Sequence, residues 1–406
     1  MNRGLLSVEE ALERLLAGAR AVGEVESVPT MAATGRVLAQ AQTSALNVPP
    51  LDNTAMDGYA VRAADCASGA ARLRVAQRIP AGAVGKPLAP GTAARIFTGA
   101  PIPPGADAVV MQEQTEAAGD DVIVKHAPKA GEWIRRAGED IRAGSAILAA
   151  GVRLRAQEIG LAASVGIAAL PVFRRVRVAL FSTGNELVMP GEPLPAGAIY
   201  NSNRFTLTGL LQMLGCEVAD LGIVPDALES TRAALREAAG ISDLIVTSGG
   251  VSVGEEDHVK PAVDAEGRLD LWRIAIKPGR PLAYGAVRRA GGGEAGFLGL
   301  PGNPVSSFVT FLLFVRPYVL RLQGAAESPP RGYAVRADFD WPRPDPRREF
   351  LRARFNRDGG LDLFPNQSSG VLTSTVWGDG LVDNPAQRPI KRGDTVRFLP
   401  FAELLR

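Results

Sequence analysis

The residues best suited to chemistry lie in the segment 243–260, DLIVTSGGVSVGEEDHVK. Its start predicts a short buried strand, because three apolar residues follow one another and a glycine pair ends the run. The next loop has backbone amides and hydroxyls that would let a phosphate approach closely, at Ser248, Gly249, Gly250, Ser252 and Gly254. Acids follow, and they would repel a phosphate unless a divalent cation lay between them, at Glu255, Glu256 and Asp257. The segment therefore indicates a metal-bridged phosphate or oxyanion site, with a solvated turn as the alternative.

Two further acids follow predicted strands. Glu186 comes after a strand expected at 177–181, and Asp226 comes after one expected at 217–224. Asp226 and Glu229 also match a helix-capping pattern, so a structural role for Asp226 stays open.

Two later loops carry cations and a helix start. Lys277 and Arg280 enclose a Pro-Gly turn, which could also be an exposed hairpin tip. In the PGNP sequence, Asn303 suits the N-cap and Pro304 the first helical position, and such a helix start presents amides to an anion. Because the carboxyl ends of parallel strands line one crevice of an open sheet, all these groups are expected to meet there. Together they fit a polyanionic, nucleotide-like ligand with Mg²⁺.

Polar loops occur outside this stretch as well. Asp57 lies in a segment broken by Pro, Asn and Gly, where it could cap a turn or be a partly buried acid. Thr98 follows a predicted strand. Arg135 and Asp140 belong to WIRRAGED, which reads either as a surface ion-pair patch or as a contact for an anionic ligand. The loop 366–370, NQSSG, could bind a ligand or only turn the chain.

Sequence periodicity divides the chain into all-β and α/β stretches. Short β-type runs separated by Gly and Pro occupy 72–150 and suggest a small all-β module. Alternating strands and helices then indicate a mostly parallel α/β sheet, and the tail from about 329 returns to short strands. Helices are expected at 7–17 with a Ser7–Glu10 capping box, at 156–165, at 204–214 behind an Asn203 N-cap, and at 227–239.

Composition sets wider bounds. The 406 residues suggest roughly two to four domains, and a formal net charge of +2 argues against a general nucleic-acid or membrane-surface binder. The N-terminus lacks the apolar core of a secretory signal, and the longest apolar stretch is too short for a membrane span. Cys66 and Cys216 form no CxxC pair, which fits buried structural thiols in a reducing cytoplasm.

Eight motifs occur together in one order: DNTAMDGYAVR, TGAP, AVVMQEQTE, IRRAGED, VALFSTGNEL, TSGGVSVGEEDHVK, IAIKPGRP and GLPGNPVS. In this combination the chain resembles the molybdopterin molybdenumtransferases, bacterial counterparts of the gephyrin E domain, from about residue 7 to its last strands. The resemblance implies four parts: an N-terminal helical and linker domain at 1–48 with 145–174, an inserted β module at 49–144, a molybdopterin-binding α/β domain at 175–324, and a C-terminal β-barrel at 325–406. It also implies a homodimer with the active cleft between protomers.

The activity implied by the resemblance is insertion of molybdate into the dithiolene of adenylated molybdopterin, with Mg-dependent pyrophosphate cleavage and AMP release. The expected catalytic residues are Asp57, Thr98, Glu186, Asp226 and Asp257, of which the last three would hold the metal. Substrate contacts are expected from Arg135, Asp140, Ser248, Gly249, Gly250, Ser252, Lys277, Arg280, Pro301, Asn303, Pro304 and Ser369. Asn185 departs from the family, which often has Asp there. Implied partners are the molybdopterin adenylyltransferase and apo-molybdoenzymes, in the cytoplasm.

Other functions stay open at this point. A related α/β domain could adenylate molybdopterin, although the long flanking modules speak against it, and a nucleotide pyrophosphatase would not need the DNTAMDGY segment. A non-catalytic scaffold is the alternative from another class, and the intact acids argue against it. Serine–histidine catalysis is disfavoured, because His126 and His258 are the only histidines and no GxSxG turn occurs.

Overall fold

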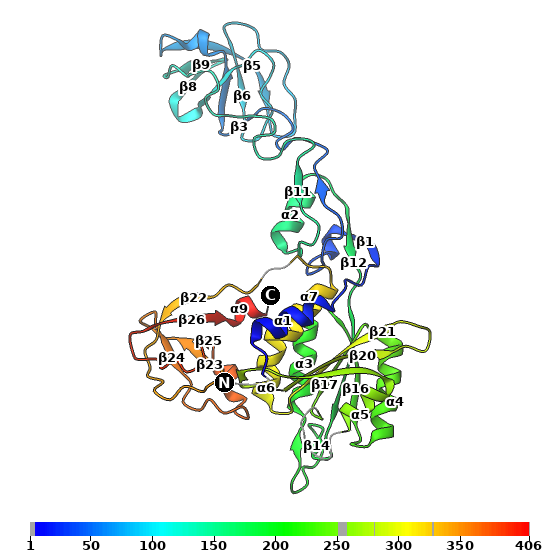
Figure 1. The fold of residues 1–406 in the computed structure, drawn as a ribbon. Helices are drawn as coiled ribbons and strands as arrows, with labels where there is room; N and C mark the ends of the chain where they lie inside the picture. Colours follow the sequence, from blue (N-terminus) through cyan, green and yellow to red (C-terminus); the bar gives the residue numbers. More distant parts are fainter. Residues whose placement is uncertain (1–4, 251–257, 280, 327–328, 406) are drawn as a thin grey trace.

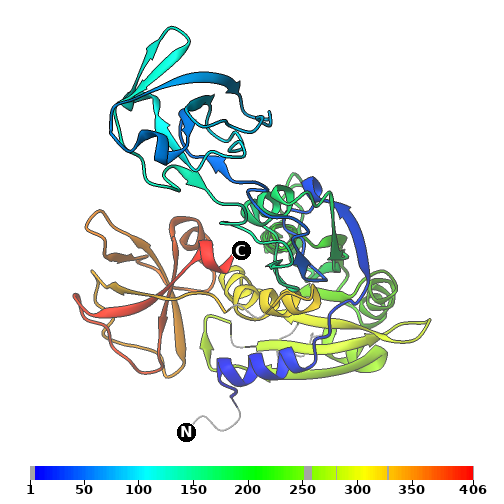
Figure 2. The ribbon, with the colours of Figure 1, turned by 90° about the horizontal axis from the view of Figure 1, so that it is seen from above.

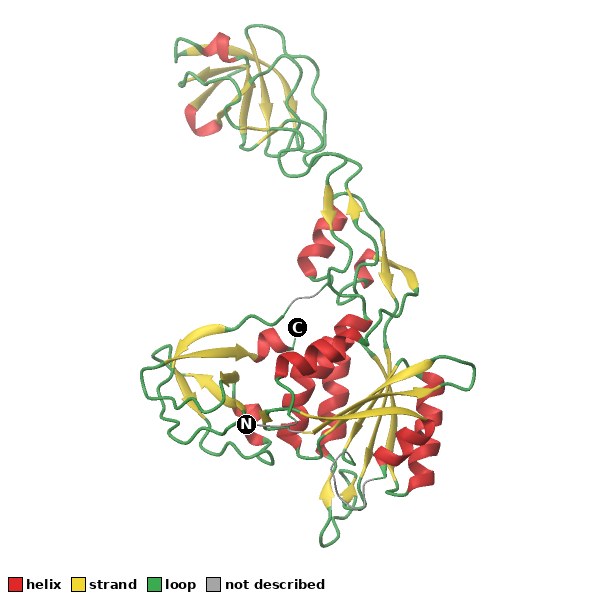
Figure 3. Cartoon of the chain, viewed as in Figure 1, coloured by secondary structure: helices red, strands yellow, loops and turns green. Residues whose placement is uncertain are grey.

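A computed structural model describes residues 5–250, 258–279, 281–326 and 329–405. Figure 1 shows an inserted β module at one end, a small linker part below it, and an α/β part beside a C-terminal sheet at the other end. Figure 2 shows that the C-terminal sheet lies beside the α/β part. Figure 3 shows that the larger helices belong to the α/β part.

The linker part is built from segments far apart in the sequence. Helix α1 (Val8–Ala17), which precedes this part and packs on the α/β part, begins with the expected capping box: the Ser7 hydroxyl accepts from the Glu10 amide, and the Glu10 carboxylate accepts from the Ser7 amide. Antiparallel ladders then join early and late segments. The elements are β1 (Val25–Pro29) with β12 (Ala169–Phe173), β2 (Gln42–Thr43) with β11 (Ala146–Leu148), η1 (Thr30–Ala32) and α2 (Ala156–Ser164).

The inserted module contains a six-stranded sheet in the order β7-β4-β6-β5-β9-β8. Small and β-branched residues fill cores on both of its faces, and one core contains Cys66, which is fully buried. The strands are β4 (Gly58–Val61), β5 (Ala71–Ile79), β6 (Thr92–Ile96), β7 (Ala108–Met111), β8 (Thr115–Ala118) and β9 (Asp121–Val124). A separate ladder joins β3 (Asn53–Thr54) to β10 (Ile134–Arg135), and short helical turns are η2 (Ala63–Cys66) and η3 (Gln112–Gln114).

The α/β part has a sheet in the order β16-β13-β17-β21-β20-β18. The first four strands are parallel, and β20 and β18 add an antiparallel edge, so the expectation of a mostly parallel sheet is confirmed. The strands are β13 (Arg177–Thr183), β16 (Glu217–Val224), β17 (Leu244–Ser248), β18 (Gly267–Arg273), β20 (Pro281–Arg288) and β21 (Glu294–Leu300), with β14 (Leu187–Val188) and β15 (Ile199–Tyr200) paired outside the sheet.

Helices cover both faces of this sheet. Two separate apolar clusters show the division: residues of α1, α3 and the 304–322 helix pack on one face, and residues of α4 and α5 on the other. Cys216 is buried in the first cluster, as the sequence predicted for both cysteines. The helices are α3 (Ser202–Met213), α4 (Leu228–Ile241), α5 (Val259–Glu266), α6 (Pro304–Thr310), the π-helical turn η4 (Phe311–Val315) and α7 (Arg316–Leu322).

The helical segment Pro304–Leu322 is long and apolar enough to cross a membrane. Inside the protein, however, 78% of its most apolar window is buried, and its side chains belong to the core on one face of the sheet. Core packing therefore accounts for its composition.

The C-terminal sheet has the order β19-β23-β25-β26-β22, with β24 paired to β23. One of its strands, β19 (Ile276–Lys277), comes from the α/β part of the sequence. The other elements are β22 (Tyr333–Arg336), β23 (Arg348–Phe355), β24 (Leu361–Leu363), β25 (Gly380–Asn384), β26 (Thr395–Pro400), α8 (Thr373–Trp377) and α9 (Phe401–Leu404).

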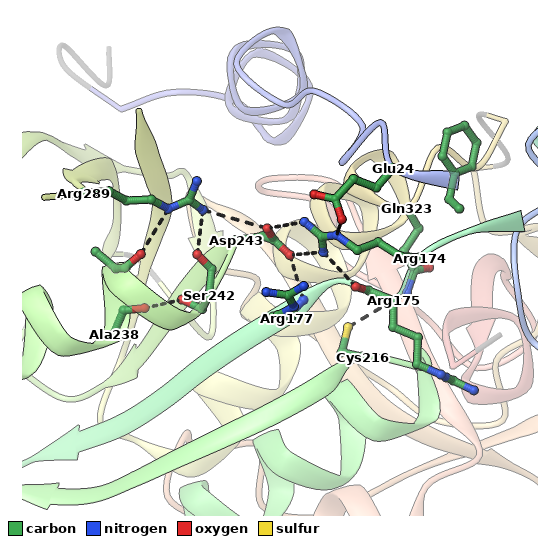
Figure 4. A network of polar contacts seen from close by, with 12 residues as sticks. Glu24, Arg174, Arg175, Arg177, Cys216, Ala238, Ser242, Asp243, Arg289 and Gln323 are labelled. Carbon is green, nitrogen blue, oxygen red and sulfur yellow. Dashed lines mark hydrogen bonds and ion pairs between the residues drawn. The ribbon is translucent and has the colours of Figure 1, made fainter. Parts of the chain in front are cut away.

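Charged groups join the linker part to the amino ends of β13 and β17 (Figure 4). Arg174 donates two hydrogen bonds to Asp243, of 2.7 and 2.9 Å, and a third of 2.8 Å to Glu24. Although burial opposes ionisation, the bonds from Arg174 and from the Arg177 amide lower the pKa of Asp243. This network fixes the sheet edge opposite to the candidate site.

Candidate functional site at the carboxyl edge of the sheet

The strand register places four loops at one edge of the α/β sheet. Thr183 pairs with Val224, and Ser248 pairs with both Ser182 and Leu300, so the four parallel strands end at nearly the same level. The loops that follow carry the expected site residues Glu186, Asp226, Gly249, Gly250, Pro301, Asn303 and Pro304. We refer to these four loop starts as the carboxyl edge.

The glycine pair packs against the end of β13. Gly249 and Gly250 have φ of +90° and +65°, and the Gly249 amide donates 3.1 Å to the Leu300 carbonyl. A Cβ at Gly249 would lie 2.6 Å from the Thr183 carbonyl oxygen, and one at Gly250 would lie 2.5 Å from Val259. From the sequence, these glycines were expected to let a phosphate approach the backbone closely. The structure adds a local reason, because no larger residue fits between the strand ends.

Asn203 ties two of the loops together. Its side-chain amide donates 2.7 Å to the Ser248 hydroxyl and 2.8 Å to the Gly302 carbonyl. The expected N-cap role of Asn203 is wrong, because α3 starts earlier and Asn201 accepts from the Arg204 amide at 3.2 Å. Sequence reasoning therefore missed Asn203 as a site residue.

Asp226 has an unpartnered oxygen at this edge. Helix α4 has Ala227 as its N-cap with no side-chain hydrogen bond, so the capping alternative for Asp226 is wrong. Within the described residues, the buried Oδ1 of Asp226 has no hydrogen-bond partner, and the Asp226 amide donates 3.4 Å to Asn185 Oδ1. A buried acceptor without a partner calls for an external donor or a cation.

Glu186 follows β13, the neighbour of the strand that precedes Asp226. Its carboxylate is exposed and lies over Gly184, where a Cβ would be 2.6 Å from Oε2. The described residues contain no group of three His, Cys, Asp or Glu side chains that could hold a metal. Asp257, the third expected metal ligand, lies outside the described residues, as do Ser252 and Arg280.

The PGNP sequence begins helix α6 with Asn303 at the N-cap position and Pro304 in the first turn, as predicted. The Val305 amide donates 3.0 Å to the carbonyl of Ser369, and the Ser307 amide donates 2.9 Å to the Asn303 carbonyl. The expectation of free amides at this helix start is therefore wrong for Val305. The hydrogen bond from Val305 to Ser369 also brings the NQSSG loop of the C-terminal part to the carboxyl edge.

Lys277 is engaged by acids of the C-terminal part. Its ammonium lies 3.4 Å from an oxygen of Asp345 and 3.4 Å from an oxygen of Glu349, while 39% of the lysine side chain remains exposed. The exposed-hairpin alternative is wrong, because Lys277 lies in β19, which pairs with β23. Partial exposure leaves the ammonium able to reach a ligand.

The remaining expected residues lie in the inserted module. The Asp57 carboxylate accepts two hydrogen bonds of 2.7 Å from Thr98, one from its amide and one from its hydroxyl, and these hold the pKa of Asp57 below its usual range. Arg135 and Asp140 are exposed. Figure 1 shows the inserted module at one end of the molecule and β14, which directly follows β13 at the carboxyl edge, at the other end. One chain therefore does not bring the two halves of the expected site together.

The two halves differ in chemistry. The carboxyl edge has acids, hydroxyls and close-packed backbone from β13, β16, β17 and β21, a set suited to a cation and a phosphorylated ligand. The module adds a fixed carboxylate–hydroxyl pair and exposed arginines.

Family models match three parts of the chain. They are the MoeA N-terminal region (domain I and II) over residues 6–166, a probable molybdopterin binding domain over 179–321, and the MoeA C-terminal region (domain IV) over 334–401.

Full-length relatives agree with these matches. A molybdopterin molybdenumtransferase of Haemophilus influenzae is 38% identical over 410 residues, which cover 99% of this chain and 100% of that protein. The one of Bacillus subtilis is 34% identical over 421 residues, or 99% of this chain and 95% of that protein. The crystal structure of the molybdopterin biosynthesis moeA protein from Pyrococcus horikoshii OT3 aligns with a TM-score of 0.83 and 29% identity, covering 98% of this chain and 100% of that one. The chain thus belongs to the molybdopterin molybdenumtransferases, a family of transferases in molybdenum cofactor biosynthesis.

Proposed function

We propose that this protein inserts molybdate into the dithiolene of adenylated molybdopterin, cleaves the pyrophosphate of that substrate and releases AMP. The carboxyl edge carries the proposal, because the buried, unpartnered Oδ1 of Asp226 follows β16, and β13 alone separates β16 from β17, the strand that leads into the serine–glycine loop. A pyrophosphate and an oxyanion repel each other, so the site must supply charge neutralisation and fixed hydrogen-bond donors.

The donors at this edge fit magnesium, which prefers carboxylate oxygens and keeps part of its water shell. Asp226 and Glu186 would hold the ion, with Asp257 as the third proposed ligand. When bound, Mg²⁺ would neutralise charge on the pyrophosphate and orient it. The unpartnered oxygen of Asp226 supports this assignment, since the described protein offers it no other donor.

Other residues of the edge position the substrate. The Ser248 hydroxyl and the loop backbone at Gly249 and Gly250 would line the phosphate site, and Asn203 holds this loop against the PGNP turn. The exposed part of Lys277 would screen phosphate charge. Ser369, bound through its carbonyl to the start of α6, would close the edge from the C-terminal part.

We infer a homodimer in which the module of one subunit completes the carboxyl edge of the other. The separation of the two half-sites within one chain supports this arrangement (Figure 1). Exposed apolar side chains give a second argument: Phe205 and Met213 lie two turns apart on α3 and are 55% and 54% exposed, and Ile199 and Tyr200 precede the helix. Several exposed apolar side chains within one short stretch, residues 199–213, are typical of an interface.

Three finer features complete the proposal. The C-terminal sheet would close as a barrel through the Ala337–Leu361 bridge, which links the end of β22 to β24. The protein would work in the cytoplasm, where two buried free thiols are stable.

It would receive substrate from the molybdopterin adenylyltransferase and deliver product to apo-molybdoenzymes.

The direct test is AMP release from adenylated molybdopterin by the purified protein with Mg²⁺ and molybdate, followed by transfer of the product to an apo-molybdoenzyme. Molybdate-dependent release that yields active enzyme supports the proposal. Substrate binding without AMP release would instead favour the non-catalytic scaffold, and AMP release independent of molybdate would favour a pyrophosphatase.

A further inference from the structure

Two arginines of the inserted module stack on one phenyl ring. The guanidinium carbon of Arg78 lies 4.5 Å from the ring centroid of Phe97, and that of Arg95 lies 4.6 Å from the same centroid. Arg95 also lies 5.2 Å from the ring centroid of Tyr59. Tyr59 and Arg78 are both register partners of Arg95, so the three side chains share one face of the sheet. We refer to these four residues as the arginine–aromatic row.

The positive charge of this row is only partly screened, because Arg95 acts electrostatically on the Asp57 carboxylate without forming an ion pair with it. Arg95 donates 2.8 Å to the Gly58 carbonyl and 2.7 Å to the Gln112 side-chain oxygen, which are neutral acceptors. In the part of the chain that the structure describes, neither Arg78 nor Arg95 forms an ion pair, and Arg78 is exposed. Two like charges held near one ring repel each other, so an anion bound between them would be favoured.

The row adjoins the module's half of the proposed site. Thr98 directly follows Phe97, and Asp57 precedes Tyr59 by two residues. The hydrogen bonds from Thr98, with the Arg95 charge adding to them, lower the pKa of Asp57. The arginine–aromatic row is therefore next to the Asp57–Thr98 pair along both strands.

Among the expected site residues that the structure describes at the opposite half, Lys277 is the one cation. Glu186 and Asp226 at the carboxyl edge are acids, and Lys277 already pairs with Asp345 and Glu349. A substrate with two phosphates needs more positive charge than Lys277 alone provides. In the proposed dimer, the module of the partner subunit would supply it.

We propose that Arg78 and Arg95, held in place by Phe97, bind a phosphate group of the nucleotide part of the substrate. Stacking on Phe97 leaves the N–H groups at the edge of the Arg78 guanidinium available for phosphate oxygens, and Arg95 adds its charge and the N–H groups that do not bind Gly58 and Gln112. The inference rests on the proposed function and adds to it a nucleotide-phosphate subsite on the inserted module.

The test measures binding of AMP to the full-length protein by isothermal titration calorimetry, with adenosine and molybdate as separate ligands. Arg78→Ala is expected to raise the Kd for AMP roughly tenfold or more, because a charge-assisted contact to phosphate is lost, and to leave adenosine binding unchanged. Phe97→Leu should weaken AMP binding less, since it removes the stacking and keeps both charges. Arg74→Ala is the matched control, because Arg74 is an exposed arginine on the same strand, and it should bind AMP as the wild type does.

Equal AMP affinity of Arg78→Ala and the wild type would overturn the inference, and so would a wild type that does not bind AMP. An effect on molybdate alone would also overturn it, because the subsite would then belong to the oxyanion. These titrations involve no turnover. The inference can therefore fail while molybdate-dependent AMP release still supports the proposed function, and it can hold where that release fails.

Discussion

The side-chain amide of Asn203, at the start of α3, donates a 2.7 Å hydrogen bond to the hydroxyl of Ser248, at the end of β17. The same amide donates to the Gly302 carbonyl of the PGNP turn. One side chain therefore fixes the spacing of two loops that the proposed mechanism assigns to the phosphates.

Asn203→Ala should raise the KM for adenylated molybdopterin roughly tenfold, because each of the two lost hydrogen bonds is worth about 1 kcal/mol and the loops are no longer held together. Steady-state AMP release measures the effect. Asn201→Ala is the control: it removes the N-cap of α3, should cost about 1 kcal/mol of stability, and should leave KM unchanged. A normal KM for Asn203→Ala would remove this residue from the site.

Asp226→Asn should raise the Mg²⁺ concentration for half-maximal AMP release at least about tenfold, because a carboxylate ligand is replaced by a neutral amide. The Tm of the variant should stay equal or rise, since the variant no longer buries an unpartnered carboxylate oxygen. Glu229→Gln, which loses an exposed ion pair with Arg232 in the first turn of α4, is the control: it should leave the Mg²⁺ dependence unchanged and cost less than about 0.5 kcal/mol of stability. Unchanged Mg²⁺ dependence in Asp226→Asn would exclude Asp226 as a metal ligand.

Thr98→Val should move the acid limb of the pH profile of kcat/KM to higher pH. Thr98 lowers the pKa of Asp57, so the Asp57–Thr98 interaction is present above the ordinary carboxyl pKa and is lost as the pH falls through the lowered one. Without the hydroxyl, Asp57 becomes protonated at a higher pH. Thr115→Val, which removes a hydroxyl elsewhere in the module, should leave the profile in place. If the wild type, Thr98→Val and Thr115→Val had the same acid limb, that limb would report the titration of a group other than Asp57.

Asp243→Ala should lower the free energy of unfolding by about 3 kcal/mol, because it leaves the mostly buried Arg174 without its bidentate partner (Figure 4). Urea unfolding measures the loss. The lowered pKa of Asp243 means that its contribution is present at neutral pH and disappears as the pH falls below the ordinary carboxyl range. Asp220→Ala breaks the more exposed Arg204–Asp220 pair and should cost less than about 1 kcal/mol. Equal losses in the two variants would contradict this assignment.

Sequence patterns predicted the regular elements well where a local signal was strong. The capping box before α1, the strand β16 at Glu217–Val224 and the Asn-Pro start of α6 are confirmed with their bounds or caps. Strand β25 was missed, because its five residues are all buried and show no alternation of apolar and polar side chains. Helix α8 was missed as well, and it has only five residues.

The side-chain partners at the site could not be predicted, since they depend on contacts between distant segments. Lys277 meets acids more than 60 residues away, and the Val305 amide meets the Ser369 carbonyl across two parts of the protein. Asn203 illustrates the same limit, because it was expected as the N-cap of α3, whereas its side chain binds Ser248 and Gly302 from distant segments.

The central claim is that each active cleft combines the module of one subunit with the carboxyl edge of the other. Co-expression of Asp57→Ala and Asp226→Ala chains, with separate tags to purify the mixed dimer, tests it directly. Each variant alone should form inactive dimers. The purified mixed dimer should regain about half of the wild-type AMP release, because one of its two symmetric clefts has both acids intact. An inactive mixed dimer would contradict the claim and place Asp57 and Asp226 in the same chain's cleft.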